Sequence, residues 1–200
     1  MTQEEIIKKL EQIAKQKDVP FYSSSEVKYK IPNLARRYIA ARYVIYDLRM
    51  VENGLYFIFY DSSTGGTYRS SAWGETFCGL FMAIDDFNSN VTIKKRQWID
   101  RLSVRRRYLT GNRLLDQAIT IHSDSKSINQ NFLKEKKIEF LNKMMRKINP
   151  IKVETEVDSW NIVPELDHKT VISISVNRWL TSSNQIEWFV VNACKYLLEE

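Results

Sequence analysis

The sequence predicts an α+β fold: a mostly antiparallel sheet, or sheets, with N-terminal, central and C-terminal helices. Helical periodicity marks both ends of the chain and a third segment that stops at Asn149-Pro150. Between them lie runs rich in Tyr, Ile, Val and Phe, joined by turn sequences and without regular strand–helix alternation. We expect a single domain over residues 1–200, or a division at 149–150 into a basic body and an acidic C-terminal part.

The first helix is predicted over residues 2–17. Thr2 and Glu5 have the spacing of a capping box, in which a hydroxyl and a carboxylate satisfy opposing backbone donors. Lys15 and Lys17 suit the negative end of the helix dipole. Apolar residues recur at helical spacing on one side, namely Ile6, Ile7, Leu10, Ile13 and Ala14. This stripe is expected to dock the helix on the rest of the protein.

Two hairpins are predicted after this helix. Residues 43–51 and 55–61 favour β structure, and Glu52-Asn53-Gly54 joins them because Asn and Gly tolerate the positive φ of a tight turn. The second hairpin is expected at 62–66, with 67–73 as its return strand.

The middle of the chain mixes short elements. Residues 33–42 are ambiguous between helix and strand, and we expect a strand or an irregular entry. A continuous apolar run at 76–87 fits either state, but Gly79 within it favours a strand. Short strands are predicted at 91–95 and 118–122, with a short helix at 97–108 between them.

The C-terminal half begins with one or two helices over 128–148. Residues 152–157, 160–163 and 171–177 are predicted to form an antiparallel meander, with a turn at 166–169. A closing helix starts near Asn184. Its apolar face is expected to pack on the sheet and consists of Ile186, Phe189, Val190, Ala193, Cys194, Leu197 and Leu198.

Composition excludes several classes of protein. The 44% hydrophobic and 27% charged residues among 200 are those of a globular protein with a core, not of a disordered chain. No run reaches the roughly 18 apolar residues that a membrane span needs, and the N-terminus resembles no secretion signal. Cys78 and Cys194 both lie in apolar stretches, so buried thiols and a cytoplasmic location are expected.

Charge is unevenly distributed. The net charge is +6, but residues 150–200 carry four basic and eight acidic residues, a net −4 that leaves +10 for residues 1–149. The densest basic stretch is 94–113, with eight basic residues against Asp100 alone. A basic body of this kind is able to bind polyanions, and it is equally able to pair with its own acidic part.

The basic stretch is the candidate polyanion-binding site. Aromatic side chains interleaved with arginines suit base stacking combined with phosphate contacts. The plainer interpretation is a solvated helix face, with Trp98, Leu102 and Leu109 packed inward. The candidate residues are Lys94, Lys95, Arg96, Arg101, Arg105, Arg106, Arg107 and Arg113, with Trp98 and Tyr108 between them.

Other chemistry lacks a complete constellation. His122 and His168 are 46 residues apart with no cysteine nearby, so no metal site is predicted. The serine runs at 23–25, 62–63, 70–71 and 182–183 fall in no nucleophile motif and are interpreted as turn and cap residues. Asp85 and Asp86 are adjacent, so on a strand they point to opposite faces and cannot share a site unless the chain turns there. Residues 63–67 lack the lysine of a phosphate-binding loop and are interpreted as a hairpin tip.

Two motifs resemble those of a known group of proteins. One is Phe77-Cys78-Gly79-Leu80-Phe81 leading to Asp85-Asp86-Phe87-Asn88; the other is Leu109-Thr110-Gly111-Asn112, followed by Asp116 and Ile119-Thr120-Ile121-His122-Ser123-Asp124. Over about residues 54–148 the chain resembles uncharacterised bacterial proteins that carry a domain of unknown function, although it lacks a transmembrane anchor. The resemblance implies an α+β fold without known catalytic residues.

These observations favour a non-catalytic binding or scaffolding module, with a protein as its partner. No catalytic residue, metal or cofactor is predicted, and an enzyme is the less favoured class. The alternative is a nucleic-acid-binding protein that uses the basic 94–113 stretch.

Overall fold

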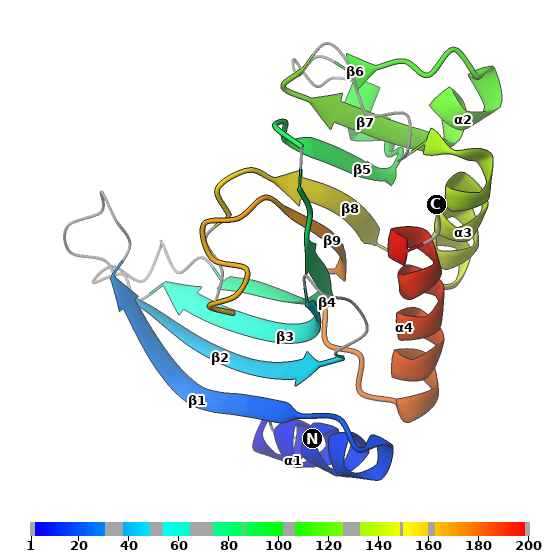
Figure 1. Cartoon of the computed structure of the whole chain (residues 1–200). Helices are drawn as coiled ribbons and strands as arrows, with labels where there is room; N and C mark the ends of the chain where they lie inside the picture. The colour runs from blue at the N-terminus through cyan, green and yellow to red at the C-terminus, as the bar shows by residue number, and fades with distance from the viewer. Residues whose placement is uncertain are drawn as a thin grey trace.

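The computed structural model describes residues 3–30, 38–48, 54–64, 74–85, 87–101, 107–125, 133–148, 150–159 and 163–198. In these ranges nine strands form one antiparallel sheet in the order β1-β2-β3-β4-β9-β8-β5-β7-β6, with N-terminal, central and C-terminal helices (Figure 1). The predicted α+β class is confirmed. The strands are β1 (Phe21–Lys30), β2 (Tyr38–Asp47), β3 (Leu55–Thr64), β4 (Gly74–Ala83), β5 (Val91–Lys95), β6 (Arg107–Tyr108), β7 (Ile119–Ser123), β8 (Ile151–Glu156) and β9 (Val171–Val176). The helical segments are α1 (Gln3–Lys17), the 3₁₀ turn η1 (Trp98–Arg101), α2 (Arg113–Ala118), α3 (Glu135–Lys147) and α4 (Ser183–Leu198).

One face of the sheet is covered by α1, α3 and α4 (Figure 1). Every second side chain of a strand points to this face. In β9 these are Ile172, Ile174 and Val176, which join Leu141 of α3 and Phe189 of α4 in one buried cluster. This cluster is the main core of the protein.

The first helix docks through the predicted stripe. Leu10 and Ala14 are buried in the main core, and the Tyr46 hydroxyl of β2 donates a hydrogen bond to the Leu10 carbonyl at 2.6 Å. That bond satisfies a hydroxyl that the core would otherwise leave unpaired. Thr2 of the predicted capping box lies outside the described residues.

The opposite face of the sheet is covered in part by the chain between β8 and β9. Val163 and Leu166 of this connection are buried against Ile58 and other side chains of β2–β4 in a second, smaller cluster. The predicted turn at 166–169 is present. The connection therefore covers part of the face opposite the helices. The side chains of β8 and β9 that point to this same face lie beside the connection.

Many predicted elements are confirmed, with ends shifted by a few residues: α1, α3, α4, the β2–β3 hairpin, and the strands β4, β5, β7, β8 and β9. Gly54 has a φ of 77°, as the predicted turn between β2 and β3 requires. β3 also pairs with β4, but the predicted hairpin tip and return strand fall mostly within residues 65–73, which lie outside the described part of the chain. The same holds for residues 31–37 and 126–132.

The helix predicted over 97–108 is wrong. Residues 98–101 form only a single 3₁₀ turn, and Arg107 and Tyr108 form a strand that pairs with β7. The Asp100 carboxylate accepts a hydrogen bond from the Gln97 N–H at 2.8 Å, which closes the turn locally. Residues 107–108 form a strand because the edge of β7 offers them backbone hydrogen-bond partners. A local sequence pattern does not reveal partners that are distant along the chain. Residues 102–106 lie outside the described ranges.

Other boundaries also differ from the prediction. The predicted strand at 160–163 is not seen at its described residue, because the Val163 carbonyl accepts turn hydrogen bonds from Leu166 N–H at 2.9 Å and Asp167 N–H at 3.1 Å. The helix α2 was not predicted, and the strand predicted over 76–87 ends at Ala83. Asp85 is exposed in a bend, and Asp86 lies outside the described residues.

The buried side of the closing helix α4 is wider than the apolar face that was predicted for it. Asn192 and Tyr196 are buried although they were not predicted to be. Of the predicted residues, Val190 is only half-buried and Leu198 is exposed. Burial raises the pKa of the Tyr196 hydroxyl above its usual range. Neither α4 nor any other described helix is long and apolar enough to span a bilayer.

Both cysteines are buried free thiols, as predicted. Cys78 lies in β4 and Cys194 in α4. Burial raises the pKa of Cys78 to about 12 and that of Cys194 to about 11, so both remain protonated at neutral pH.

Candidate functional site

Strand register places polar side chains in rows across the face of the sheet that the helices leave open. Cross-strand partners share a face, so the pairings β9–β8–β5–β7–β6 define each row. The first row contains Ser173, Glu154, Thr92, His122 and Arg107. The second row contains Ser175, Lys152, Lys94 and Thr120.

A concavity of about 630 Å³ lies where these rows meet the apolar strands β3 and β4. Its apolar wall includes Tyr60, Phe77 and Phe81, with the Tyr60 and Phe77 rings stacked at 5.0 Å between centroids. Its polar floor comes from β5, β8 and β9. The volume of the concavity and its mixed apolar and polar lining match those of small-molecule sites in proteins.

Two serines form the deepest polar part of the floor. Ser173 and Ser175 are 7% and 3% exposed, and both line the concavity. A serine hydroxyl that faces the concavity is able both to donate to an occupant and to accept from it.

An ion pair crosses the floor beside the serines. Lys152 and Glu154 lie two residues apart on β8, and their charged atoms are 2.6 Å apart. Their side chains are 31% and 32% exposed, so a bound molecule has access to both groups. Glu156, at the end of β8, accepts a hydrogen bond from the Ser159 hydroxyl at 3.2 Å. The floor therefore offers a donor and an acceptor that neutralise each other.

Hydrogen bonds hold the rim of the concavity between β5 and β8. The Asn90 side-chain oxygen accepts from Val157 N–H at 2.9 Å, and its nitrogen donates to Asp124 at 2.9 Å. The Thr155 hydroxyl donates to the Ser89 carbonyl and accepts from Val91 N–H, both at 2.9 Å. These residues are already paired, so they shape the rim and leave the floor groups to meet an occupant.

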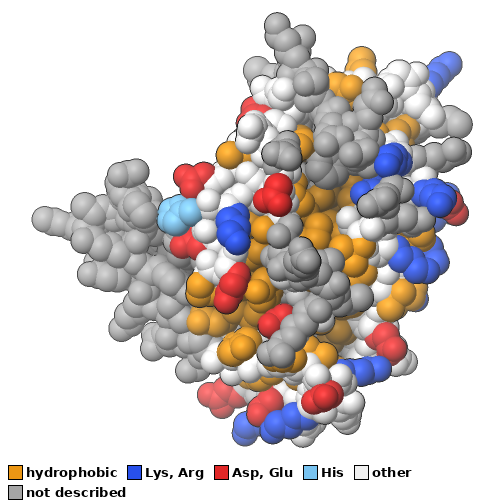
Figure 2. Space-filling model, viewed as in Figure 1, with side chains coloured by type: hydrophobic (Ala, Val, Ile, Leu, Met, Phe, Trp, Pro, Cys, Tyr) orange, Lys and Arg blue, Asp and Glu red, His pale blue; other side chains and the backbone are white. Residues whose placement is uncertain are grey.

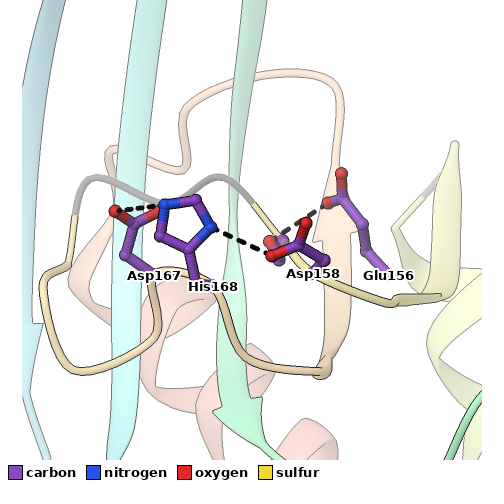
Figure 3. A network of polar contacts seen from close by, with 5 residues as sticks. Glu156, Asp158, Asp167 and His168 are labelled. Carbon is purple, nitrogen blue, oxygen red and sulfur yellow. Dashed lines mark hydrogen bonds and ion pairs between the residues drawn. The ribbon is translucent and has the colours of Figure 1, made fainter.

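The connection between β8 and β9 begins at residues 158–159 and ends at 167–169, and these two segments, which lie together, form its neck. The neck carries a polar network next to the concavity (Figure 3). His168 Nδ1 lies 2.9 Å from an Asp158 oxygen, and its Nε2 lies 3.8 Å from Asp167. The hydrogen bond to Asp158 and the charges of both aspartates raise the pKa of His168. Backbone bonds reinforce the neck, since Ser159 N–H donates to Lys169 O at 2.9 Å and His168 N–H donates to Ser159 O at 2.8 Å.

The structure separates the candidate residues of the predicted basic site into those that make contacts within the fold and those that are exposed. Lys94 is paired with Asp100 at 2.8 Å, and Tyr108 packs against the main core. Arg96 donates to the Asp116 carbonyl at 3.1 Å. These three candidates therefore hold β5, β6 and α2 together.

Arg107 also serves the fold. Its guanidinium donates to the carbonyls of Asp116 and Ile119, the latter at 3.1 Å. Its neighbour across the strand pair is His122. Within the described chain, Arg107 Nε and His122 Nδ1 are the two buried side-chain atoms without a hydrogen-bond partner.

The remaining basic candidates are either exposed or lie outside the described residues. Lys95 and Arg113 are exposed; the side chain of Arg101 and all of Arg105 and Arg106 lie outside the described part. The expectation that Trp98 and Leu109 pack inward is wrong, because they are 75% and 64% exposed. In the view of Figure 2, basic side chains are most frequent where α2 and α3 lie, and acidic and basic ones are interspersed around α1.

The concavity itself was missed in the sequence. Its signal is the strict alternation of Val171–Val176, in which serines occupy the face opposite Ile172 and Ile174. The alternation predicts a strand, but serine on one side of a central strand also indicates a polar site on that face. The apolar wall lies far from β9 in sequence, and only sheet order brings the two together.

No arrangement in the described ranges brings three His, Cys, Asp or Glu side chains together to hold a metal ion. Comparison with protein families, with curated proteins and with solved structures yields no match to this chain. The resemblance to uncharacterised bacterial proteins therefore stays a prediction.

Proposed function

We propose that this protein is a non-catalytic binding module that holds a ligand in the concavity on the open face of its sheet. The observation that carries this proposal is the position of Ser173 and Ser175, two serines of a central strand that line the concavity and are 7% and 3% exposed. A fold selected for stability alone gains more from apolar side chains at two central strand positions than from serine. Serine there supports a role in binding.

The polar groups of the site also support binding over catalysis. Glu154 is paired with Lys152, and Glu156 with Ser159. These contacts engage both carboxylates within the floor, which supports a role in orienting a ligand.

A fragment library tests the proposal through the amide chemical shifts of isotopically labelled protein. We expect hits that move the amides of β8 and β9 and leave those of α1 unchanged. Replacing both serines, Ser173→Val with Ser175→Val, removes the hydroxyls, fills the floor and should abolish these shifts. Ile172→Val, on the other face of the same strand, is the matched control and should retain them. Shifts confined to other surfaces would reject the proposal.

A second candidate function, polyanion binding, is favoured by the exposure of Trp98. An indole that is 75% exposed next to a basic stretch is available for stacking on a nucleic-acid base. Lys95, the last residue of β5, and Arg113, the first residue of α2, are also exposed. Because Lys94, Arg96 and Arg107 are engaged within the fold, any such site is smaller than the predicted one.

Electrophoretic shift of single-stranded DNA at about 50 and 200 mM salt tests this second candidate, because phosphate contacts weaken steeply with salt. Trp98→Ala should cost about 1–3 kcal/mol of binding free energy if the indole stacks on a base. Leu109→Ala removes an exposed apolar side chain without a ring and serves as the control. Equal binding by both variants rules the candidate out.

Cysteine use supports a cytoplasmic location for this module. Cys78 and Cys194 are free and buried in separate elements. Structural cysteines of extracellular proteins are usually paired in disulfides, whereas cytosolic thiols stay reduced.

A further inference from the structure

We propose that the ligand held in the concavity is a neutral saccharide. This inference rests on the proposed function and concerns the chemical class of the ligand. Three properties of the lining carry it: its charge, its hydrogen-bonding groups and its aromatic wall.

Charge excludes acidic ligands from the floor. Among the described residues, the charged side chains that line the concavity are Lys152, Glu154 and Glu156, so these residues bring no excess of positive charge. Lys152 is already compensated by Glu154 at 2.6 Å. A phosphate or carboxylate that approached Lys152 would lie next to the Glu154 carboxylate, and like charges repel most strongly where water is partly excluded. A neutral ligand avoids this cost.

The hydrogen-bonding groups match hydroxyls. Nine of the fifteen described residues that line the concavity are polar, too many for an acyl chain. The Ser173, Ser175 and Thr92 hydroxyls each donate and accept, whereas an ammonium only donates and a carboxylate only accepts. A polyhydroxylated molecule has the same dual capacity, so it can donate to the Glu154 carboxylate and accept from the Lys152 ammonium at adjacent positions.

The aromatic wall provides the complementary apolar surface. Phe77 lies between Tyr60 and Phe81, with ring centroids 5.0 and 5.8 Å away respectively, and all three line the concavity. The C–H face of a pyranose ring is apolar, and it gains from removing aromatic surface from water. A sugar ring placed against this wall directs its equatorial hydroxyls toward β8 and β9.

Calorimetric titration with three neutral trisaccharides (maltotriose, cellotriose and N-acetylchitotriose) tests this inference. We expect at least one to bind and to shift the amides of β8 and β9. Trigalacturonate, of similar size but acidic, should bind at least tenfold more weakly. Glu154→Gln should weaken the neutral trisaccharide at least tenfold, since a hydrogen bond to a charged acceptor is lost. Glu187→Gln, on the exposed side of α4, is the matched control and should leave affinity unchanged.

The failures of the two proposals are distinguishable. If no neutral trisaccharide binds, the saccharide inference is overturned. If triglycine or trigalacturonate binds at β8 and β9 in its place, the binding function still stands with another ligand class. If, in addition, no fragment shifts these strands, the proposed function fails as well.

Discussion

The Lys94 ammonium lies 2.8 Å from the Asp100 carboxylate, and this ion pair ties β5 to the turn η1 that follows it. The Asp100 side chain is 5% exposed, and its carboxylate also accepts from Gln97 N–H at 2.8 Å and the Thr120 hydroxyl at 3.3 Å. One carboxylate thus organises the part of the chain where a longer helix was predicted. Its contacts give the first prediction.

Asp100→Asn should lower the free energy of unfolding by about 1–3 kcal/mol, because a buried charged acceptor is replaced and Lys94 loses its partner. Urea unfolding measures the change. Glu11→Gln is the matched control, since Glu11 pairs with Lys15 at 3.0 Å on the exposed surface of α1. That control should stay within about 0.5 kcal/mol of the wild type. Equal effects of both substitutions would contradict the role given to Asp100.

The same carboxylate should make stability depend on pH. Burial raises the pKa of Asp100, but the bonds from Lys94, Gln97 and Thr120 outweigh it and hold the pKa below its usual range. A depressed folded-state pKa contributes stability above the unfolded value, and that contribution is lost as pH falls through the folded value. Urea midpoints measured from neutral to acidic pH should fall less steeply in Asp100→Asn than in the wild type.

His168 should titrate above the usual histidine range. Its hydrogen bond to Asp158 and the nearby Asp167 charge raise its pKa above 6.5. A raised folded-state pKa contributes stability that is complete below the unfolded value and is lost as pH rises through the folded value. Imidazole proton shifts followed against pH measure the pKa, and Asp158→Asn should lower it. An unchanged pKa in that variant would show that the neck network does not act on His168.

Gly79→Ala should strongly destabilise the protein. Gly79 faces Ser175 across the β4–β9 pair, and a Cβ at this position would lie 2.4 Å from the Ile174 carbonyl oxygen and 2.8 Å from Ser175 Cα. Backbone atoms cannot move aside, so the strands would have to separate, at a cost of about 3 kcal/mol. Thermal unfolding measures it. Wild-type stability in this variant would show that β4 and β9 are not paired as described.

Phe189→Ala should destabilise the protein by about 3–5 kcal/mol, the usual cost of removing a buried aromatic ring. Phe189 is fully buried and stacks on Phe57 of β3 at 5.7 Å between centroids. Thermal and urea unfolding measure the loss. Glu187→Gln, two residues earlier in α4, should be nearly silent because its pair with Lys17 is exposed. A normal thermal midpoint in Phe189→Ala would contradict the assignment of α4 to the core.

Local patterns predicted the faces of elements well. The stripe containing Leu10 and Ala14, and the face containing Phe189 and Ala193, are buried as expected. Helical periodicity and strand alternation are properties of neighbouring residues, so they can be read without knowing the fold. The failure at residues 97–108 has a different cause. There, Asp100 ends a short turn, and β7 recruits Arg107 and Tyr108 as an edge strand, which depends on contacts distant in sequence.

The candidate site shows the same division between local and distant information. The sequence by itself determined that 171–176 is a strand with serine on one side and isoleucine on the other. Only the tertiary structure decided that β9 lies between β4 and β8, so that Phe81, Ser173 and Glu154 share one row. Alternation is encoded residue by residue, whereas strand order is chosen by the burial of the whole core. The same holds for the basic stretch: its charges are visible in the sequence, but the fold decided that Lys94, Arg96 and Arg107 bind within the protein and that Trp98 faces solvent.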